Sequence, residues 1–281
     1  MTTDPLPREP MPVPAAARSR RFDHLSAPEA RHQARRPGCT LVWPFGAIEQ
    51  HGPHLPLATD GLFAERILDA VLAELDPDGP LWRLPLQSLG FSPEHGGFGG
   101  TLSLPAELIL ELVAAVGHSL AALGVRRLLL FNGHGGQIAL LEVAARRLRA
   151  EAPGLAVLPC FLWRGADGLD ALIPEPERSQ GLHAGLAETS LMLHQAPALV
   201  GVVPPADGLV AQAEAPPGWS LEGALPCAWL TADLSTSGVI GDPGGAEATL
   251  GRQLERRLVR GWSQRLEALM LSDWPPQSPG V

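Results

Sequence analysis

Acidic and imidazole side chains gather within residues 41–61, LVWPFGAIEQHGPHLPLATDG, directly after a run of apolar residues. The apolar run predicts a buried strand, and the prolines and glycines that follow predict a loop rather than a helix. Glu49 and His51 are two residues apart, so their side chains point the same way if the backbone is extended. With Asp60 they offer carboxylate oxygens and imidazole nitrogens, which are ligands for zinc, manganese and iron. The alternative is a polar surface loop without a bound metal.

Three more segments carry groups of similar chemistry. Glu94 and His95 lie in a second glycine-rich loop, His134 lies in the sequence NGHGG, and His183 precedes Glu188 by five residues. The first two of these segments follow predicted strands. Because the carboxyl ends of parallel strands share one edge of a sheet, we expect these groups to meet in space. Alone, Glu188 would indicate only a carboxylate favoured by a helix dipole, and Glu94 with His95 only a hydrogen-bonded loop anchor.

The glycines around His134 bear on its role. Gly133, Gly135 and Gly136 would let the backbone approach a bound group closely while the imidazole binds a metal. The spacing matches neither G-x-G-x-x-G nor a phosphate-binding loop with its lysine. A strand-to-helix turn without a ligand is the competing interpretation. We favour a metal ligand because the acidic loop offers matching groups.

The elements that must position these groups alternate between strands and amphipathic helices. Short apolar runs predict the strands, and apolar residues at three- and four-residue spacing predict the helices. This alternation predicts one α/β domain whose mainly parallel sheet is covered by helices on both faces. The predicted strands begin near Cys39 and cover about 81–86, 126–131 and 155–162, and the predicted helices cover about 26–36, 61–75, 105–123, 138–150, 183–196 and 245–272.

Composition limits the class of protein. The 281 residues are 45% apolar and 18% charged with a net charge of −9, which is typical of a globular domain and disfavours a nucleic-acid partner. No apolar run approaches the roughly 18 residues that span a bilayer, and no signal peptide is evident, so we expect a cytoplasmic protein without a membrane partner. Cys39, Cys160 and Cys227 are expected to be reduced, with Cys160 inside a strand. Residues 1–21 are expected to form a flexible tail and residues 22–275 a single domain.

Six motifs follow one another in an order that is found in a known family. They are Glu49-Gln-His51 with Asp60, Ser92-x-Glu94-His95, Gly100-Thr-Leu-Ser-Leu, Asn132-Gly-His134-Gly-Gly, His183-Ala-Gly-x-x-Glu188-Thr-Ser, and Gly241-Asp-Pro243. The series resembles the creatininase family of metal-dependent amidohydrolases over about residues 22–262. This resemblance implies a three-layer α/β/α fold of the flavodoxin-like creatininase type, and a homo-oligomer that is frequently a hexamer.

The resemblance also implies roles for individual residues. Four positions match those that bind a pair of divalent metal ions (zinc, manganese or iron), with the aspartate bridging the pair: Glu49, His51, Asp60 and His134. Creatininase itself has a further carboxylate where this chain has Gly136, and we infer that Glu188 supplies the missing ligand. Gly135 also replaces a tyrosine that flanks the creatinine site, which disfavours creatinine as the substrate.

The implied activity is hydrolysis of an amide or cyclic amide C–N bond in a small-molecule substrate by water activated at two metal ions. Glu188 and His134 would take part as ligands, and His183 is the candidate proton shuttle to the departing nitrogen. Backbone N–H groups of residues 133–136 are candidate oxyanion donors. Glu94 and His95 are expected to support the ligands.

Three other functions fit the same residues. The peptidase of the mycofactocin system shares the Gly-Gly and the His-Ala-Gly-x-x-Glu-Thr-Ser, which suggests a peptidase acting on a short peptide. Another branch of the family removes a formyl group, which suggests a formamide deformylase. A non-catalytic metal-binding or small-molecule-binding protein is the third, although a complete ligand set argues against it. Residues 167–181 and 219–229 are expected to decide between a groove and a closed pocket.

Overall fold

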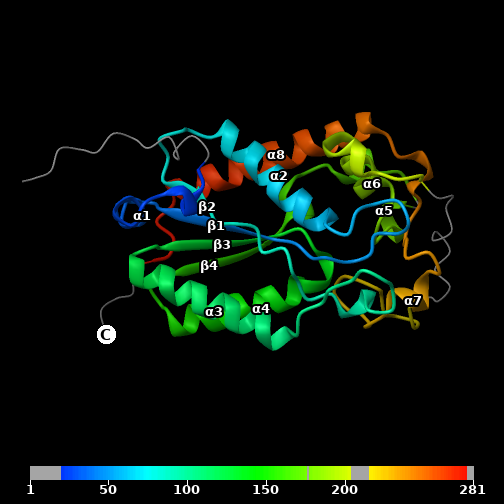
Figure 1. Cartoon of the computed structure of the whole chain (residues 1–281), viewed down its shortest axis with the longest axis horizontal. Coiled ribbons are helices and arrows are strands. Elements are labelled where there is room, and N and C mark those ends of the chain that lie inside the picture. Colours follow the sequence, from blue (N-terminus) through cyan, green and yellow to red (C-terminus); the bar gives the residue numbers. More distant parts are fainter. Residues whose placement is uncertain (1–19, 176, 204–214, 277–281) are drawn as a thin grey trace, which may run out of the picture.

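A four-stranded parallel sheet forms the centre of the protein, in a computed structural model that describes residues 20–175, 177–203 and 215–276. The strands lie in the order β2-β1-β3-β4 (Figure 1). The chain therefore leaves β1 towards one edge and returns on the other side of β1, so the strand order reverses between β1 and β3. This order agrees with the predicted flavodoxin-like sheet. The strands are β1 (Thr40–Phe45), β2 (Leu81–Arg83), β3 (Arg127–Asn132) and β4 (Ala156–Phe161).

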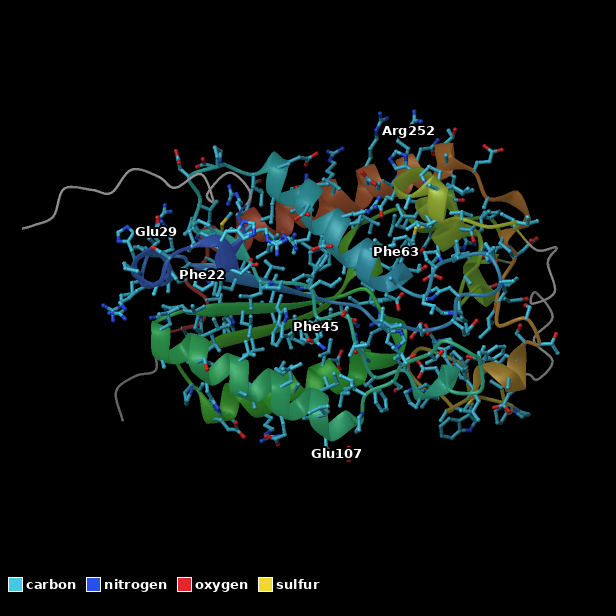
Figure 2. All side chains as sticks on the ribbon, viewed as in Figure 1. Phe22, Glu29, Phe45, Phe63, Glu107 and Arg252 are labelled. Atoms are coloured by element: carbon cyan, nitrogen blue, oxygen red, sulfur yellow. The ribbon has the colours of Figure 1, made fainter. Side chains whose placement is uncertain are left out.

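Helices cover both faces of the sheet, as the alternation of elements predicts (Figure 1). On one face α2 packs on β1 and α8, and α6 packs on α8; on the other face α3 packs on α4, which also contacts β4. Each face has its own hydrophobic core, with Phe63 buried in the first and Phe45 in the second (Figure 2). The helices are α1 (Ala27–Ala34), α2 (Thr59–Glu74), α3 (Ala106–Leu123), α4 (Ile138–Glu151), α5 (Glu177–Gln180), α6 (Leu186–Gln195), α7 (Thr231–Leu234) and α8 (Ala248–Leu271).

Strand β1 continues through a proline that was expected to mark its end. Pro44 and Phe45 remain paired with β3, opposite Phe131 and Asn132. The backbone of Pro44 faces the β2 side, where its carbonyl accepts a hydrogen bond from Gln87 N at 2.9 Å. Because β2 has already ended at that level, the missing N–H of proline breaks no ladder bond.

Helix α2 begins earlier than predicted, and this moves one candidate ligand. It starts at Thr59 rather than Gly61, so Asp60 lies in the first helical turn and not in the preceding loop. A Cβ at Gly46 would lie 2.5 Å from the Cα of Gly61, so these glycines permit the end of β1 and the start of α2 to touch. The glycines that suggested a loop therefore serve a close packing contact.

Helix α6 begins later than predicted. It starts at Leu186, whereas His183 lies before the helix and forms an isolated antiparallel bridge with Ile240. His183 N donates to Ile240 O at 3.0 Å, and Ile240 N donates to His183 O at 2.8 Å. The candidate proton shuttle is thus held by a bridge to a segment almost 60 residues away, which helical spacing could not reveal.

The predicted tail is too long by two residues. Arg20 is 3% exposed, and its guanidinium donates to the carbonyls of Leu75 and Leu81 at 3.3 and 3.2 Å. Arg21 forms a bridge with Arg83 of β2. Residues 20 and 21 therefore belong to the folded region, and the rest of the predicted tail lies outside the described residues. The three cysteines are free, as expected, and Cys160 lies in β4.

Helix α3 is long and apolar enough to cross a membrane by length and composition, with a mean hydropathy of 1.6 over its 18 residues. This differs from the expectation that no apolar segment reaches that length. However, Ile109, Val113 and Leu120 of this helix are buried in the second core. A core helix passes the same test, so the hydropathy of α3 carries no conclusion about a membrane.

Candidate metal centre

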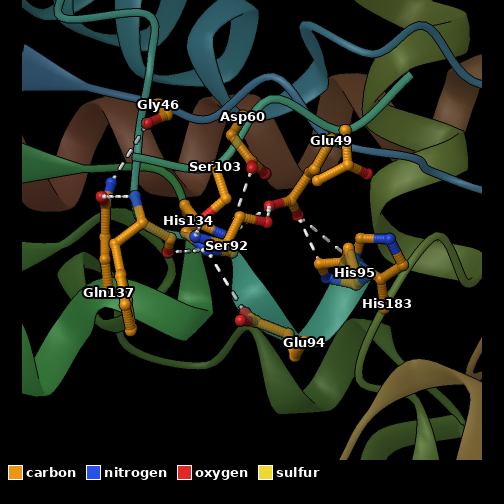
Figure 3. A network of polar contacts seen from close by, with 12 residues as sticks. Gly46, Glu49, Asp60, Ser92, Glu94, His95, Ser103, His134, Gln137 and His183 are labelled. Atoms are coloured by element: carbon orange, nitrogen blue, oxygen red, sulfur yellow. Dashed lines mark hydrogen bonds and ion pairs between the residues drawn. The ribbon is translucent and has the colours of Figure 1, made fainter. Parts of the chain in front are cut away.

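The carboxyl ends of β1 and β3 bring the predicted ligands together. Figure 3 shows three of them, Glu49, Asp60 and His134, pointing towards one another. Glu49 and His51 follow β1, Asp60 lies at the start of α2, and His134 follows β3. All four side chains are at most 3% exposed. Glu188 joins them from the first turn of α6. The convergence occurs where the strand order reverses, which is the usual place for a site in an open α/β sheet.

The five predicted ligands fall into two groups whose ligand atoms lie within 4.8 Å of one another. One group is Glu49, Asp60 and His134, and the other is His51, Asp60 and Glu188. Asp60 belongs to both groups, which is the bridging position that the family resemblance implies. The grouping fits a pair of divalent ions that share one carboxylate.

Three atoms of this cluster are buried without a hydrogen-bond partner among the described residues, namely Glu49 Oε1, His51 Nε2 and Asp60 Oδ2. His51 Nε2 lies 3.3 Å from Asp60 Oδ1 and 3.9 Å from Glu49 Oε1. An unsatisfied buried polar group costs about 1–3 kcal/mol, so three of them side by side require an explanation. Divalent cations at the two ligand groups would satisfy all three, and the residues present therefore fit metal ions.

Backbone carbonyls orient both ligand histidines. His51 Nδ1 donates to Glu49 O at 3.2 Å, which leaves Nε2 directed at the carboxylates. His134 Nε2 donates to Phe91 O at 3.0 Å, which leaves Nδ1 3.2 Å from Glu49 Oε2 and 3.4 Å from Asp60 Oδ2. Metal-binding histidines usually have their second ring nitrogen held in this way, so both imidazoles have the arrangement expected of candidate ligands.

The charges of the cluster shift its pKa values. Burial alone would lower the pKa of His51, but Asp60 and Glu49 outweigh it and raise that pKa to about 9. Burial would also lower the pKa of His134, but Glu49 and Asp60 outweigh it and raise that pKa well above 6.5. Burial would raise the pKa of Asp60, but the two histidines hold it below its usual range. Protons on the histidines thus balance the carboxylates in the metal-free protein, and a metal ion must displace them.

Glu188 is fixed by the turn that precedes its helix. Its Oε2 accepts a hydrogen bond from Ala184 N at 2.6 Å, and Ala184 has a positive φ of 54°. Burial raises the pKa of Glu188 to about 7, against the opposing effect of His51. A cation at the second ligand group would favour the charged carboxylate.

His183 faces the same centre as a neutral imidazole. Its Nε2 donates to Gln50 O at 2.7 Å, and its Nδ1 lies 3.9 Å from Glu49 Oε1. Burial, with the nearby His51 and His95, holds the pKa of His183 well below 6.5. The lone pair is therefore on Nδ1, where it can accept a proton or bind a metal. Consistent with the second option, Glu49, His51 and His183 form a third group of candidate ligand atoms.

Glu94 and His95 contact the ligands, which is the position expected of supporting residues (Figure 3). His95 Nε2 lies 3.3 Å from Glu49 Oε1, and Glu94 Oε1 lies 3.4 Å from His134 Nε2. A Cβ at Gly136 would overlap the Glu94 carboxylate. Glu94 thus occupies the space that a side chain at position 136 would need.

Two residues that support the centre were missed as site residues. The hydroxyl of Ser92 donates to Glu49 Oε2. The Gln50 side chain donates from Nε2 to His95 Nδ1 at 2.8 Å and to Gly238 O at 3.1 Å. Both residues lie inside the sequence motifs: Ser92 is two positions before Glu94, and Gln50 lies between Glu49 and His51. Their places in the motifs could have identified them as site residues.

A cavity of about 250 Å³ opens at the ligands. Its walls include the loop of residues 133–136 and residues from both segments that were expected to shape the site, such as Ile173, Glu177 and Trp229. The Trp229 indole is held by a hydrogen bond to Leu221 O at 3.0 Å. A larger cavity of about 460 Å³ between α4, β4 and α8 contains none of the predicted site residues. The chemical types of the lining residues, and not the volume of the cavity, therefore identify the site.

Comparisons with known proteins match this arrangement to one family. The sequence pattern of the creatininase (creatinine amidohydrolase) family fits residues 23–266. The mycofactocin precursor peptide peptidase of Mycobacterium ulcerans (strain Agy99) is 36% identical over 249 residues, which cover 86% of this chain and 88% of that protein. The creatinine amidohydrolase of Pseudomonas putida is 32% identical over 175 residues, which cover 58% and 66%.

Solved structures of creatininases have the same fold as this chain. A creatinine amidohydrolase structure covers 90% of this chain and 99% of its own, with a TM-score of 0.73 and 25% identity. Solved creatininases include a manganese form (TM-score 0.71, 24% identity, 89% of this chain and 98% of that one) and a Zn–Zn form of a mutant (TM-score 0.70, 25% identity, 90% and 99%). The names of two of these structures mention manganese and zinc, and the candidate ligands of this chain are carboxylate and imidazole groups. The chain belongs to the creatininase family of hydrolases that act on C–N bonds.

Proposed function

We propose that the chain hydrolyses an amide bond of a short peptide with the help of two divalent metal ions. The ligands of the two ions are Glu49, His51, Asp60, His134 and Glu188. The observation that carries this proposal is the pair of ligand groups that share Asp60 and contain three unpaired buried atoms. When bound, the ions would lower the pKa of a water molecule and polarise the substrate carbonyl.

His183 moves the proton in this proposal. Its Nδ1 accepts a proton from the attacking water and then gives it to the departing nitrogen, while Nε2 stays bonded to Gln50 O. The bond to Gln50 keeps the ring in one orientation through both transfers. Glu49 Oε1, 3.9 Å from Nδ1, stabilises the imidazolium that exists between them.

Hydrogen bonds within the loop reduce the number of candidate oxyanion donors among the backbone N–H groups of residues 133–136. Gly133 N already donates to Phe45 O at 2.8 Å, and His134 N donates to Asn132 Oδ1 at 3.0 Å. Those two N–H groups are therefore engaged in holding the loop. Gly135 and Gly136 begin a 3-10 turn, where N–H groups have no partner within the turn, and we assign them as the donors.

Two observations support a peptide-type substrate over a small ring. The peptidase of M. ulcerans matches this chain over most of its length, whereas the creatinine amidohydrolase of P. putida matches 58% of it. Of the residues that the structure describes, a Cβ at Gly135 would meet only Glu222 Oε1, at 3.9 Å, so these residues leave the cavity wall open at this position. Creatinine, a formamide and other small amides are the second candidates. We also propose a homo-oligomer, on family resemblance, and retain the expected cytoplasmic location as a proposal.

Metal content and substrate range test the proposal together. We expect wild-type protein to bind about two equivalents of zinc or manganese per chain and to release new amino groups from short peptides. Asp60→Ala should lose both equivalents and the activity, and His134→Ala should lose one equivalent and the activity. His118→Ala, an exposed histidine on α3, is the matched control and should behave as wild type. No metal uptake would refute the mechanism. Turnover of creatinine or a formamide without peptide hydrolysis would replace the proposed substrate and retain the metal centre.

A further inference from the structure

Glu177 is a buried carboxylate that the proposed mechanism does not use. It lies on α5, is 7% exposed, and lines the cavity of the metal centre. Within the described ranges, no ion pair joins it to an arginine, lysine or histidine. Burial raises the pKa of its carboxyl, against two backbone hydrogen bonds that lower it. A buried acidic group that forms no ion pair is costly, so its contacts should show what it stabilises.

The two carboxylate oxygens bind two different segments. Oε1 accepts a hydrogen bond from Leu186 N and Oε2 accepts one from Asp242 N, each at 2.7 Å. Leu186 is the first residue of α6, and the preceding residue, Gly185, has no side chain that could cap the helix. Glu177 therefore caps α6 from another part of the chain, with its negative end at the positive end of the helix dipole.

These contacts enclose the segment that carries His183 and Glu188. His183 bridges Ile240, Leu186 follows His183 by three residues, and Asp242 follows Ile240 by two. The carboxylate thus joins the two segments directly beyond their bridge. Leu186 also precedes Glu188 by two residues, so the capping bond lies in the same helical turn as the candidate ligand.

The surrounding backbone leaves room for this carboxylate. A Cβ at Gly185 would overlap Glu177 Oε1, and a Cβ at Gly181 would lie 2.5 Å from the same atom. A Cβ at Gly241 would lie 2.9 Å from Oε1 and 3.0 Å from Oε2. All three positions lack a side chain where one would collide with Glu177. This explains the glycine of the Gly241-Asp-Pro243 motif, which the mechanism does not use.

We propose that Glu177 is a positioning residue that holds the segment from His183 to Glu188 against the metal centre, so that Glu188 reaches the second metal ion. It does so through the Leu186 and Asp242 amides, and among the described residues it belongs to none of the candidate ligand groups. This inference rests on the proposed two-metal function. Without the cap, the first turn of α6 loses the bond that fixes its entry, and the Glu188 carboxylate loses its position.

Metal titration of Glu177→Gln tests the inference directly. Glutamine keeps the size of the side chain but can accept through one oxygen only, so one of the two amide bonds is lost. We expect the affinity for the second equivalent of zinc to fall at least tenfold, with the first equivalent unchanged and the far-ultraviolet circular dichroism spectrum retained. Glu175→Gln, an exposed carboxylate two residues away that pairs with Arg178, is the matched control and should titrate as wild type.

Gly185→Ala provides an independent test that keeps the carboxylate. The three nearest atoms to a Cβ at this position all belong to Glu177, so the methyl group should displace the cap and weaken the second metal site in the same way. In a Glu177→Ala background the same change should have little further effect, because nothing remains to be displaced. If Glu177→Gln does not fold, the metal titration of Gly185→Ala decides whether Glu177 has the proposed positioning role.

The outcomes separate the two proposals. Two equivalents of unchanged affinity in Glu177→Gln or in folded Gly185→Ala, or additive effects of Gly185→Ala and Glu177→Ala, would overturn the positioning role and leave the proposed function standing. Failure of the wild type to bind two equivalents would instead remove the two-metal function on which the inference rests.

Discussion

Asp60 is the residue on which both candidate metal positions depend, because its carboxylate belongs to both ligand groups. Glu188 belongs to only one of them. We therefore expect Asp60→Asn to lose both equivalents of bound metal and Glu188→Gln to lose one. Elemental analysis of the purified variants measures this, with Glu107→Gln on the outer face of α3 as control. Equal losses in the two variants would contradict the assignment of Asp60 as the shared ligand.

His183 has two possible roles, as a proton shuttle or as a metal ligand, and one substitution distinguishes them. If it is the proton shuttle, His183→Asn should lower kcat by about 10²–10⁴-fold and leave the metal content unchanged. If it is instead a ligand with Glu49 and His51, the metal content should fall with the activity. Steady-state kinetics and elemental analysis on the same preparation give both quantities. We expect the first result, because the five ligands of the two groups that share Asp60 do not include His183.

Glycines control how closely the elements approach the site, and two neighbours make opposite predictions. A Cβ at Gly133 would overlap the backbone carbonyl of Asp60, which cannot move without shifting the start of α2. We expect Gly133→Ala to lower the free energy of unfolding by about 1–3 kcal/mol and to weaken metal binding. Gly135→Ala should be tolerated, because only Glu222 Oε1 lies near, at 3.9 Å.

Chemical denaturation and metal titration of the two alanine variants check this contrast. Unchanged stability and metal affinity in Gly133→Ala would show that α2 is not held by the end of β3. A loss in Gly135→Ala of the same size would show that the effect belongs to the loop conformation and not to the contact with Asp60.

The sequence predicted the order of elements well, because buried strands and amphipathic helices have distinct apolar spacing. It failed where contacts between distant segments set the local structure. Pro44 continues β1 because β2 has already ended beside it, and Gly61 lies within α2 because Gly46 packs on it. His183 precedes its helix because it pairs with Ile240. None of these partners is visible in a local pattern.

The candidate metal ligands were easier to predict from the sequence than the residues that hold them in place. Carboxylate and imidazole ligands are distinctive in type, and placing them after parallel strands was sufficient to expect that they meet. The residues that hold them are ordinary hydroxyl, amide and carboxyl side chains such as Ser92, Gln50 and Glu177. Their partners lie up to 188 residues away, as for Gln50 and Gly238, and residue type alone could not identify them.

The whole molecule places a buried acidic cluster at the reversal of its strand order, between two separate hydrophobic cores. Such a cluster can remain folded only if positive charge enters it, as protons or as metal ions. The carboxylates raise the pKa values of His51 and His134, which is the direction that the first option requires. Stability, protonation and metal binding of the entire fold should therefore be linked.

The pH dependence of this linkage has a definite sign. The pKa of His51 is about 9 in the folded metal-free protein and lies near 6.5 in the unfolded chain. The stability that its protonation contributes is therefore complete below about pH 6.5 and is lost as the pH rises through 9. Metal binding displaces this proton, so affinity should rise by up to about tenfold per pH unit for each proton released.

We therefore expect the melting temperature of metal-free protein to fall between pH 6.5 and 8.5, and the increase in melting temperature on adding buffered zinc or manganese to grow over the same range. Differential scanning calorimetry of metal-free and metal-loaded protein measures both changes. Asp60→Asn, which lacks the shared ligand, should show no metal-dependent increase at either pH. A metal-induced increase that shrinks as the pH rises would mean that the ions bind without displacing protons from His51 and His134, and hence that these histidines are not the ligands.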